Sequence, residues 1–281
     1  MQEGTFSRTA ERVAIRRAAH QLLDQPRVLD DPLALRIIGS EAEEALRSNP
    51  KEDHSFSRAF RAFMAARSRY TEDELAGAFA QGVRQYVVLG AGLDTFAYRN
   101  PHPELQVFEV DHPATQTWKR KQLQAADIAI PTSLTFVPVD FERQTLADGF
   151  GQAGFNPSTA AFFSWLGVTP YLTREACTST LTFIAKMPAG SGVVFDFAVD
   201  RGLLNPGQRI ARDALSKRVA RYGEPLQLFF DPGKLQDELK SLGFQRTEFL
   251  QGKELNARYF KDRKDGLLVR GSVGHLMGAW V

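Results

Sequence analysis

Residues 85–98 read Gln-Tyr-Val-Val-Leu-Gly-Ala-Gly-Leu-Asp-Thr-Phe-Ala-Tyr, and this stretch decides the fold. Residues 86–89 form an unbroken apolar or aromatic run, which predicts a strand buried on both faces. Gly90 and Gly92 follow, and glycines let the backbone turn sharply and approach a ligand closely. Strand, glycine turn and helix build a nucleotide site in open α/β sheets. The run lacks the third glycine of a dinucleotide fingerprint and the Lys-Ser/Thr of a phosphate loop, so an ordinary tight turn stays an alternative.

The bulk composition excludes several classes of protein. The chain has 281 residues, 43% hydrophobic and 24% charged, with a formal net charge of +2. These values are typical of a globular protein with a sizeable core and give no basic footprint for nucleic acid. The single cysteine, Cys177, allows no internal disulfide, and we expect it to belong to the core. No stretch approaches the roughly 20 apolar residues of a membrane span, so we expect no membrane association and a cytoplasmic protein.

Short apolar runs recur along the chain and alternate with helical patterns. Further strands are expected at residues 105–110, 134–139, 159–165 and 193–197, and two terminal strands at 244–250 and 267–273. This alternation predicts an α/β fold with a doubly wound, mostly parallel sheet of seven strands. We expect a single domain with four segments: an N-terminal helical cap (1–82), a core (83–200), an inserted helical lid (201–230) and a C-terminal helix with strands (231–281).

One arginine falls on an apolar helix face. In the helix expected from about Ser55 to Tyr70, Arg67 lies on the same stripe as three phenylalanines and a methionine. A guanidinium on a buried face needs an anionic partner, which is either a structural ion pair or a ligand carboxylate. Thr71 and Glu74 have the spacing of a capping box, which predicts that a new helix begins there.

Acidic residues follow two of the expected strands. Glu109 and Asp111 end the second strand and point to the same side of it, 19 and 21 residues after Gly90. A carboxylate there is placed to accept hydrogen bonds from the ribose hydroxyls of a nucleotide, although Asp111 could instead cap the next helix. Asp140 follows the third strand in the same way. The basic cluster 119–121 is expected to be solvated surface.

These motifs resemble those of a known family, the class I S-adenosylmethionine-dependent methyltransferases of the leucine carboxyl methyltransferase-like group, above all its bacterial branch found in actinomycetes. The resemblance covers nearly the whole chain. The matching motifs are Ser7-Arg-Thr-Ala-Glu-Arg-Val-Ala, Leu29-Asp-Asp-Pro-Leu-Ala, Ala66-Arg-Ser-Arg-Tyr, Val88-Leu-Gly-Ala-Gly-Leu-Asp-Thr-Phe-Ala-Tyr-Arg, Glu109-Val-Asp-His-Pro, Val137-Pro-Val-Asp-Phe, Gly167-Val-Thr-Pro-Tyr-Leu and Phe230-Asp-Pro-Gly.

The resemblance implies a Rossmann-like fold, S-adenosyl-L-methionine as the cofactor and a set of cofactor-binding residues. Arg67 matches the arginine that holds the methionyl carboxylate, and Asp111 matches the acidic residue on the ribose, with Glu109 as second choice. The remaining matches are Gly90 at the turn under the methionine, Asp94 just after it, and Asp140 with Phe141 beside the adenine.

The chain departs from the family pattern at Leu166, where relatives commonly carry a glutamate, and at Pro170 in the same loop. We assign no catalytic residue, since none of the five histidines is placed as a base, and no metal site. The expected function is O-methylation of a carboxylate or hydroxyl on a small molecule, in secondary metabolism. Alternatives are a catalytically impaired cofactor-binding or interaction protein, a protein carboxyl methyltransferase, and a nicotinamide-dependent oxidoreductase, which should show the absent three-glycine loop.

Overall fold

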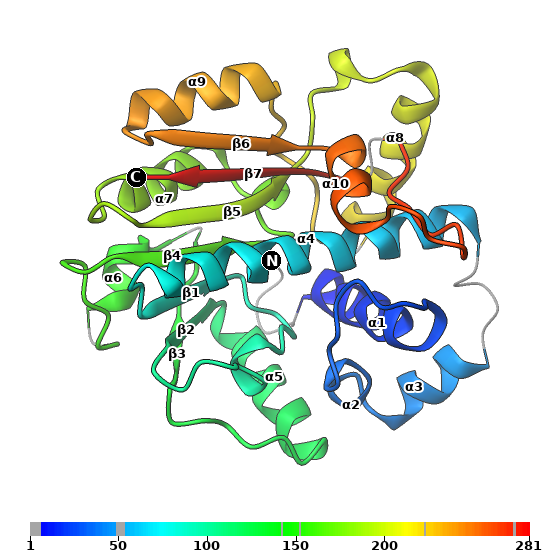
Figure 1. Ribbon diagram of the computed structural model, residues 1–281, viewed down its shortest axis with the longest axis horizontal. Helices are drawn as coiled ribbons and strands as arrows, with labels where there is room; N and C mark the ends of the chain where they lie inside the picture. Colours follow the sequence, from blue (N-terminus) through cyan, green and yellow to red (C-terminus); the bar gives the residue numbers. More distant parts are fainter. Residues whose placement is uncertain (1–6, 49–53, 142, 152, 222, 272–273) are drawn as a thin grey trace.

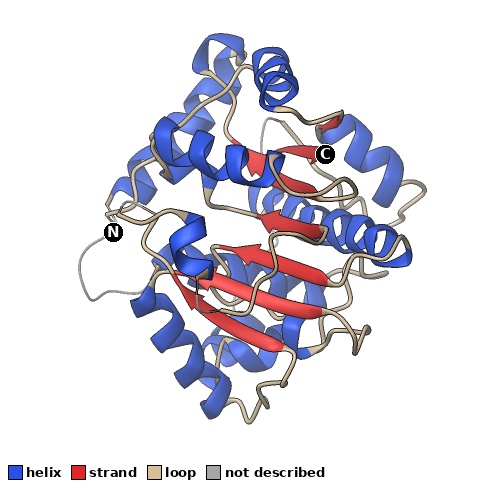
Figure 2. Cartoon of the chain, turned by 90° about the vertical axis from the view of Figure 1, so that its left-hand side faces the viewer, coloured by secondary structure: helices blue, strands red, loops and turns tan. Residues whose placement is uncertain are grey.

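The computed structural model describes residues 7–48, 54–141, 143–151, 153–221, 223–271 and 274–281. Helices lie on both sides of one sheet, so the molecule has three layers (Figures 1 and 2). The strands are β1 Gln85–Leu89, β2 Gln106–Asp111, β3 Leu134–Pro138, β4 Ala161–Trp165, β5 Gly192–Phe197, β6 Arg246–Leu250 and β7 His275–Trp280. The α-helices are α1 Arg8–Leu23, α2 Ala34–Ile37, α3 Ser40–Arg47, α4 Ser55–Ala80, α5 Pro113–Ala125, α6 Leu146–Phe150, α7 Arg174–Ala185, α8 Pro206–Ala220, α9 Pro232–Leu242 and α10 Gly252–Tyr259.

The sheet has the strand order β3-β2-β1-β4-β5-β7-β6. The pairs among β1 to β5 are parallel, and β7 is antiparallel to both β5 and β6. This confirms the predicted α/β fold with seven strands. The chain reverses its direction of winding between β1 and β4, and open α/β sheets bind ligands in the crevice at the carboxyl ends of such strands.

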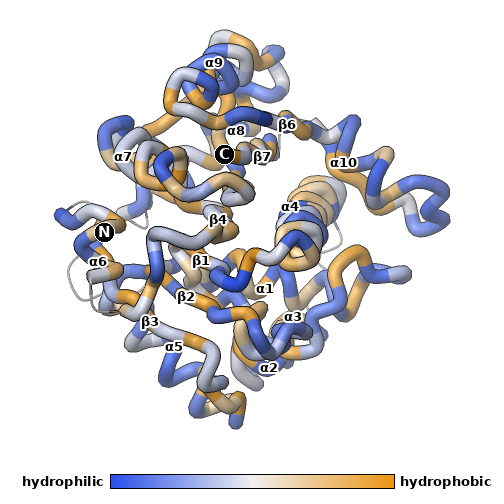
Figure 3. The backbone as a smooth tube through the Cα atoms, turned by 60° about the vertical axis from the view of Figure 1, so that its left-hand side comes forward, coloured by the Kyte–Doolittle hydropathy of each residue, from blue (hydrophilic) through white to orange (hydrophobic). Residues whose placement is uncertain are grey.

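Each face of the sheet is buried by its own set of helices. Core side chains of α6, α7 and α9 pack on one face, whereas those of α4 and α10 pack on the other. Figure 3 shows α4 and α10 on one side of the strands and α6 and α7 on the opposite side. All residues of β1, β4 and β5 are buried, as expected for strands covered on both faces. None of the helices within the described residues is long and apolar enough to span a bilayer.

The N-terminal helices do not divide where the sequence suggested. Helix α4 runs without interruption through Thr71, so the prediction that a new helix begins at the Thr71–Glu74 capping box is wrong. The Thr71 hydroxyl donates instead to the carbonyl oxygen of Arg67, 2.8 Å away, as serines and threonines inside helices commonly do. Helix α4 packs along one face of the sheet. Helices α1–α3 lie at the right-hand side of Figure 1, and α8 lies on the same side.

The final strand begins later than predicted. Of the expected strand 267–273, residues 267–271 are not in a strand and residues 272–273 lie outside the described residues, whereas β7 starts at His275. The reason is visible at Val269, whose amide donates to Asn256 Oδ1 while its carbonyl accepts from Asn256 Nδ2. Because the Asn256 side chain of α10 takes the single N–H donor of Val269 and also binds its carbonyl oxygen, Val269 has no donor left for a strand partner.

Candidate functional site

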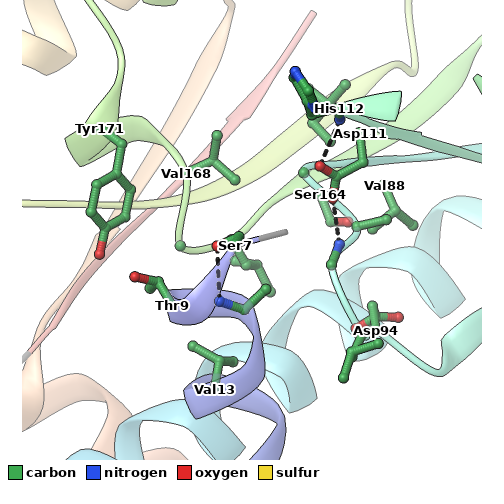
Figure 4. Close-up of a pocket in the computed structure, with 18 of the residues that line it drawn as sticks. Ser7, Thr9, Val13, Val88, Asp94, Asp111, His112, Ser164, Val168 and Tyr171 are labelled. Atoms are coloured by element: carbon green, nitrogen blue, oxygen red, sulfur yellow. Dashed lines mark hydrogen bonds between the residues drawn. The ribbon is translucent and has the colours of Figure 1, made fainter. Parts of the chain in front are cut away.

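A cavity of about 470 Å³ opens at the carboxyl ends of β1, β2 and β4. It is lined by every residue that the sequence predicted for the cofactor: Arg67, Gly90, Asp94, Asp111, Asp140 and Phe141. Figure 4 shows Asp111 and His112 on one side of this cavity and Thr9 and Tyr171 on the opposite side. The topology therefore gathers residues that lie up to 74 positions apart in the sequence into one site.

The glycine turn after β1 is required by what packs against it. Gly90 and Gly92 have φ angles of +66° and +46° in the left-handed region. A Cβ on Gly90 would lie 2.2 Å from Val168 Cγ2, and a Cβ on Gly92 would lie 2.9 Å from Ala10 Cβ. Both glycines thus allow the loop after β4 and the start of α1 to approach the turn and form walls of the cavity.

Asp111 is held by the backbone around it. Its carboxylate accepts from the amide of Gly92 at 2.6 Å and from the amide of His112 at 2.7 Å. The N-cap residue of α5 is His112, so the alternative that Asp111 caps this helix is wrong. Burial raises the pKa of Asp111, although both backbone amides favour the charged form. The carboxylate is therefore fixed in direction at the edge of the cavity, with lone pairs left for a ligand.

Glu109, the second choice for the ribose, is not a pocket residue. Its side chain is 1% exposed and forms an ion pair of 2.7 Å with Lys119 Nζ, while the Tyr98 hydroxyl lies 3.3 Å away. The expectation that Lys119 is solvated surface is wrong, since its side chain is also 1% exposed. Burial raises the pKa of Glu109 to about 7 despite the nearby ammonium. This pair belongs to the core beneath the site.

Arg67 forms a structural ion pair, which is one of the two interpretations that the sequence left open, and the ligand carboxylate stays a prediction. Arg67 is 5% exposed, and its Nη1 forms an ion pair with Asp196 Oδ2 at 2.5 Å. It also lines the cavity. Within the described residues its Nη2 has no hydrogen-bond partner, and its Nε has none either but is enclosed by the protein. A guanidinium that retains a free donor beside a cavity is suited to a ligand carboxylate.

Asp94 joins the glycine turn to the N-terminal helices. Its Oδ2 accepts from Arg17 Nη1 at 3.1 Å, and Arg17 Nη2 also binds Asp31 Oδ2 and the Thr95 hydroxyl. Burial acts to raise the pKa of Asp94, but the charges of Arg17 and Lys119 outweigh it and the pKa is lowered. Sequence reasoning missed Arg17, although the Asp-Asp-Pro motif that includes Asp31 was a signal of an acidic partner nearby.

Segments far apart in the sequence form what we call the outer wall: residues 7–14, 168–172 and 223–227. The Thr9 hydroxyl donates to the Glu224 carboxylate in a short hydrogen bond, and the Thr9 amide donates to the same oxygen at 3.1 Å. The Tyr171 hydroxyl interacts with the Thr9 side chain, and burial raises the pKa of Tyr171 to about 12. No sequence pattern predicts the contact between Thr9 and Glu224, because 215 residues separate them.

The cavity fits the expected cofactor in its size and its donors and acceptors. Its volume lies in the range of small-molecule sites. It offers a carboxylate at the end of β2, where ribose hydroxyls are bound in α/β folds, and a guanidinium with a free donor for a carboxylate. These groups are the complements of the ribose and the amino-acid carboxylate of S-adenosyl-L-methionine.

Comparisons of sequence point to one family. The profile of the family described as leucine carboxyl methyltransferase matches residues 10–185. Over 291 aligned residues the chain is 34% identical to YktD of Bacillus subtilis (strain 168), whose provisional name is that of an S-adenosyl-L-methionine-dependent methyltransferase, and 95% of each chain is covered. A Saccharopolyspora erythraea protein with the same type of provisional name is 32% identical over 191 residues, which cover 67% of this chain and 66% of the relative.

Solved structures share the fold. A crystal structure of a protein provisionally named a methyltransferase from Thermobifida fusca YX matches with a TM-score of 0.58 and 15% identity, covering 99% of this chain and 96% of the other. A DUF574 family protein from Streptomyces avermitilis MA-4680 gives a TM-score of 0.52 at 14% identity, covering 87% and 94% of the two chains.

Proposed function

We propose, from the premise that the chain belongs to the leucine carboxyl methyltransferase family and is an S-adenosyl-L-methionine-dependent methyltransferase, that its methyl acceptor is an oxygen atom of a small molecule. The oxygen belongs to a carboxylate or a hydroxyl group, and the proposed setting is secondary metabolism in the cytoplasm. All four segments of the chain act as one methyltransferase domain in this proposal.

The proposed cofactor contacts follow from the residues that line the cavity. Asp111 accepts from the ribose hydroxyls, and Arg67 binds the methionyl carboxylate. Gly90 leaves room under the methionine and Asp94 supports that turn through Arg17. Asp140 accepts from the adenine amine and Phe141 packs on the base.

Methyl transfer requires the protein to position the acceptor more than to transfer a proton. S-adenosyl-L-methionine supplies an electrophilic methyl group on its sulfonium. The chain's task is to hold an acceptor oxygen in line within about 3–3.5 Å and to keep water out. An acceptor carboxylate is already ionised at neutral pH and needs no base, whereas a hydroxyl acceptor needs one. We assign no catalytic base.

The observation that carries the proposal is the contact between two outer-wall segments beside a cavity that all six predicted cofactor residues line. The Thr9–Glu224 hydrogen bonds join the start of α1 to the segment after α8 across the cavity. This contact narrows the opening of the cavity, which favours a small acceptor over the terminus of a protein chain, because a chain terminus would need an open groove. A catalytically impaired protein remains the alternative, since Leu166 replaces the glutamate common in the family.

The test uses S-adenosyl-L-methionine labelled in the methyl group. The purified protein is incubated with a metabolite fraction below about 3 kDa or with the protein fraction of the same lysate, and with Asp111→Ala as the inactive control. We expect label in small molecules: base-labile label that is released as methanol marks an ester, and base-stable label marks an ether. Label confined to protein would refute the small-molecule acceptor. Binding of the cofactor with no label in either fraction would support the impaired protein, and Leu166→Glu would then be tested for gain of activity.

A further inference from the structure

Asp196 does not line the cavity, yet it binds two elements that do. It is the next-to-last residue of β5 and is 7% exposed. Its Oδ2 accepts from Arg67 Nη1 of α4 at 2.5 Å, and its Oδ1 accepts from the amide of Gly167 after β4, also at 2.5 Å. One buried carboxylate thus joins the cofactor arginine to the loop that begins the outer wall.

The orientation of the Arg67 guanidinium depends on this contact. Gly167 has a φ angle of +77°, and a Cβ there would lie 3.3 Å from both Nη1 and Nη2, so the glycine leaves the space that the guanidinium fills. With Nη1 bound to Asp196 and Nε enclosed by the protein, Nη2 is the guanidinium nitrogen that stays without a partner in the described part of the chain and is open to a ligand. The ion pair at Nη1 and the close packing against Gly167 together fix the plane of the guanidinium and so the direction of its remaining donor.

The same residue also holds the loop. The Thr169 hydroxyl donates to the carbonyl oxygen of Asp196 at 2.6 Å, so the loop is bound at both Gly167 and Thr169. Val168 and Tyr171 of that loop line the cavity. Leu166, directly before this loop, is apolar, and the anion beside Arg67 comes from β5, the strand next to β4.

We propose that Asp196 is a positioning residue, which fixes Arg67 for the amino-acid carboxylate of the cofactor and fixes the 167–172 loop at the same time. This inference rests on the proposed function, in which Arg67 binds that carboxylate. Both partners of Asp196 are N–H donors, so only a group with two acceptor oxygens satisfies them. An asparagine would turn its NH₂ group toward one of the two donors and leave that donor unpaired.

Two ligands separate positioning from general damage. S-adenosyl-L-homocysteine carries the amino-acid carboxylate, whereas 5′-deoxy-5′-methylthioadenosine has the same adenosine and thioether without it. For Asp196→Asn we expect the Kd of S-adenosyl-L-homocysteine, measured by isothermal titration, to rise roughly tenfold or more. The Kd of methylthioadenosine should change less than about twofold. The matched control is Asp237→Asn, whose side chain is 81% exposed on α9, and it should change neither Kd.

A double-mutant cycle tests whether the effect passes through Arg67. In an Arg67→Gln background, Asp196→Asn should raise the Kd of S-adenosyl-L-homocysteine by less than about twofold further, because the guanidinium that Asp196 positions is already absent. Should Asp196→Asn fail to fold by circular dichroism, Asp196→Glu is measured in its place, with the same selective loss expected from the displaced carboxylate. An equal loss for both ligands, or no loss, would overturn the proposal. Failure of the wild type to bind either ligand would refute the cofactor site itself, and with it this inference.

Discussion

Replacing Asp111 by alanine should abolish tight cofactor binding without unfolding the protein. The Asp111 carboxylate is fixed by the amides of Gly92 and His112 and points its remaining lone pairs to the cavity. Two ribose hydroxyls that donate to a carboxylate form hydrogen bonds to a charged group, each worth about 1.5–3 kcal/mol. Their sum is at least about 3 kcal/mol, and since about 1.4 kcal/mol corresponds to a tenfold change, the Kd should rise roughly 100-fold or more.

The assay is isothermal titration of S-adenosyl-L-homocysteine into the wild type and the variant, with thermal unfolding measured in parallel. Glu109→Gln is the matched control, because Glu109 lies two residues earlier on the same strand and is paired with Lys119 outside the cavity. It should change the Kd of the folded protein by less than about twofold. If Asp111→Ala binds like the wild type, or if Glu109→Gln loses affinity as strongly, the assignment of the ribose site to Asp111 is refuted.

Three further predictions concern the turn, the wall and the buried pair. Gly90→Ala should lower the melting temperature and abolish S-adenosyl-L-homocysteine binding, because the new Cβ would lie 2.2 Å from Val168 Cγ2 on a left-handed backbone. The control is Gly82→Ala, where the backbone is also left-handed but the space around the Cβ is open. It should lower the melting temperature and leave binding unchanged. Thr9→Val should speed amide hydrogen exchange in residues 223–227, as followed by mass spectrometry, since the hydroxyl bound to Glu224 is lost, whereas Thr117→Val on α5 should leave this exchange unchanged. The pKa of Glu109 is raised from 4.5 to about 7, so this group favours folding below about pH 4.5 and that contribution is lost as the pH rises to about 7. Between pH 4.5 and 8, denaturant titrations should show the free energy of unfolding of the wild type falling by up to roughly 3 kcal/mol relative to that of Glu109→Gln. A difference in unfolding free energy between the two proteins that stays constant with pH would contradict this prediction.

The parts of the site that follow strand ends could be predicted from the sequence. Gly90, Asp111 and Asp140 each come directly after an apolar run, and parallel strands bring their carboxyl ends to one edge of the sheet. The sequence also singles out Arg67, because it is a cation on an apolar helix stripe. The same reasoning does not reveal Lys119 of α5. Thr115, Lys119 and Leu123 are spaced by four residues and are all buried, but only Leu123 is apolar, so the sequence shows no apolar stripe there.

The partners of these residues could not be predicted in the same way. Arg67 and Asp196 are 129 residues apart, and Thr9 and Glu224 are 215 apart, so no local pattern records either contact. The late start of β7 has a related cause. Residues near Val269 are apolar enough for a strand, but the Asn256 side chain takes the backbone groups of Val269, and this competition depends on tertiary packing.

The outer wall has a consequence for how such an enzyme changes its acceptor. In the proposed function, the part of the cavity that binds the methyl donor comes mainly from one continuous stretch, residues 86–141, together with Arg67, and the outer wall borders the acceptor. The outer wall comes from three short segments, at the start of α1, after β4 and after α8. Substitutions or insertions in residues 223–227 can therefore reshape the acceptor half and leave the donor half intact. Grafting that segment, with a matching residue at position 9, is a direct route to a transferase with altered acceptor scope, and divergence among relatives should concentrate in the same places.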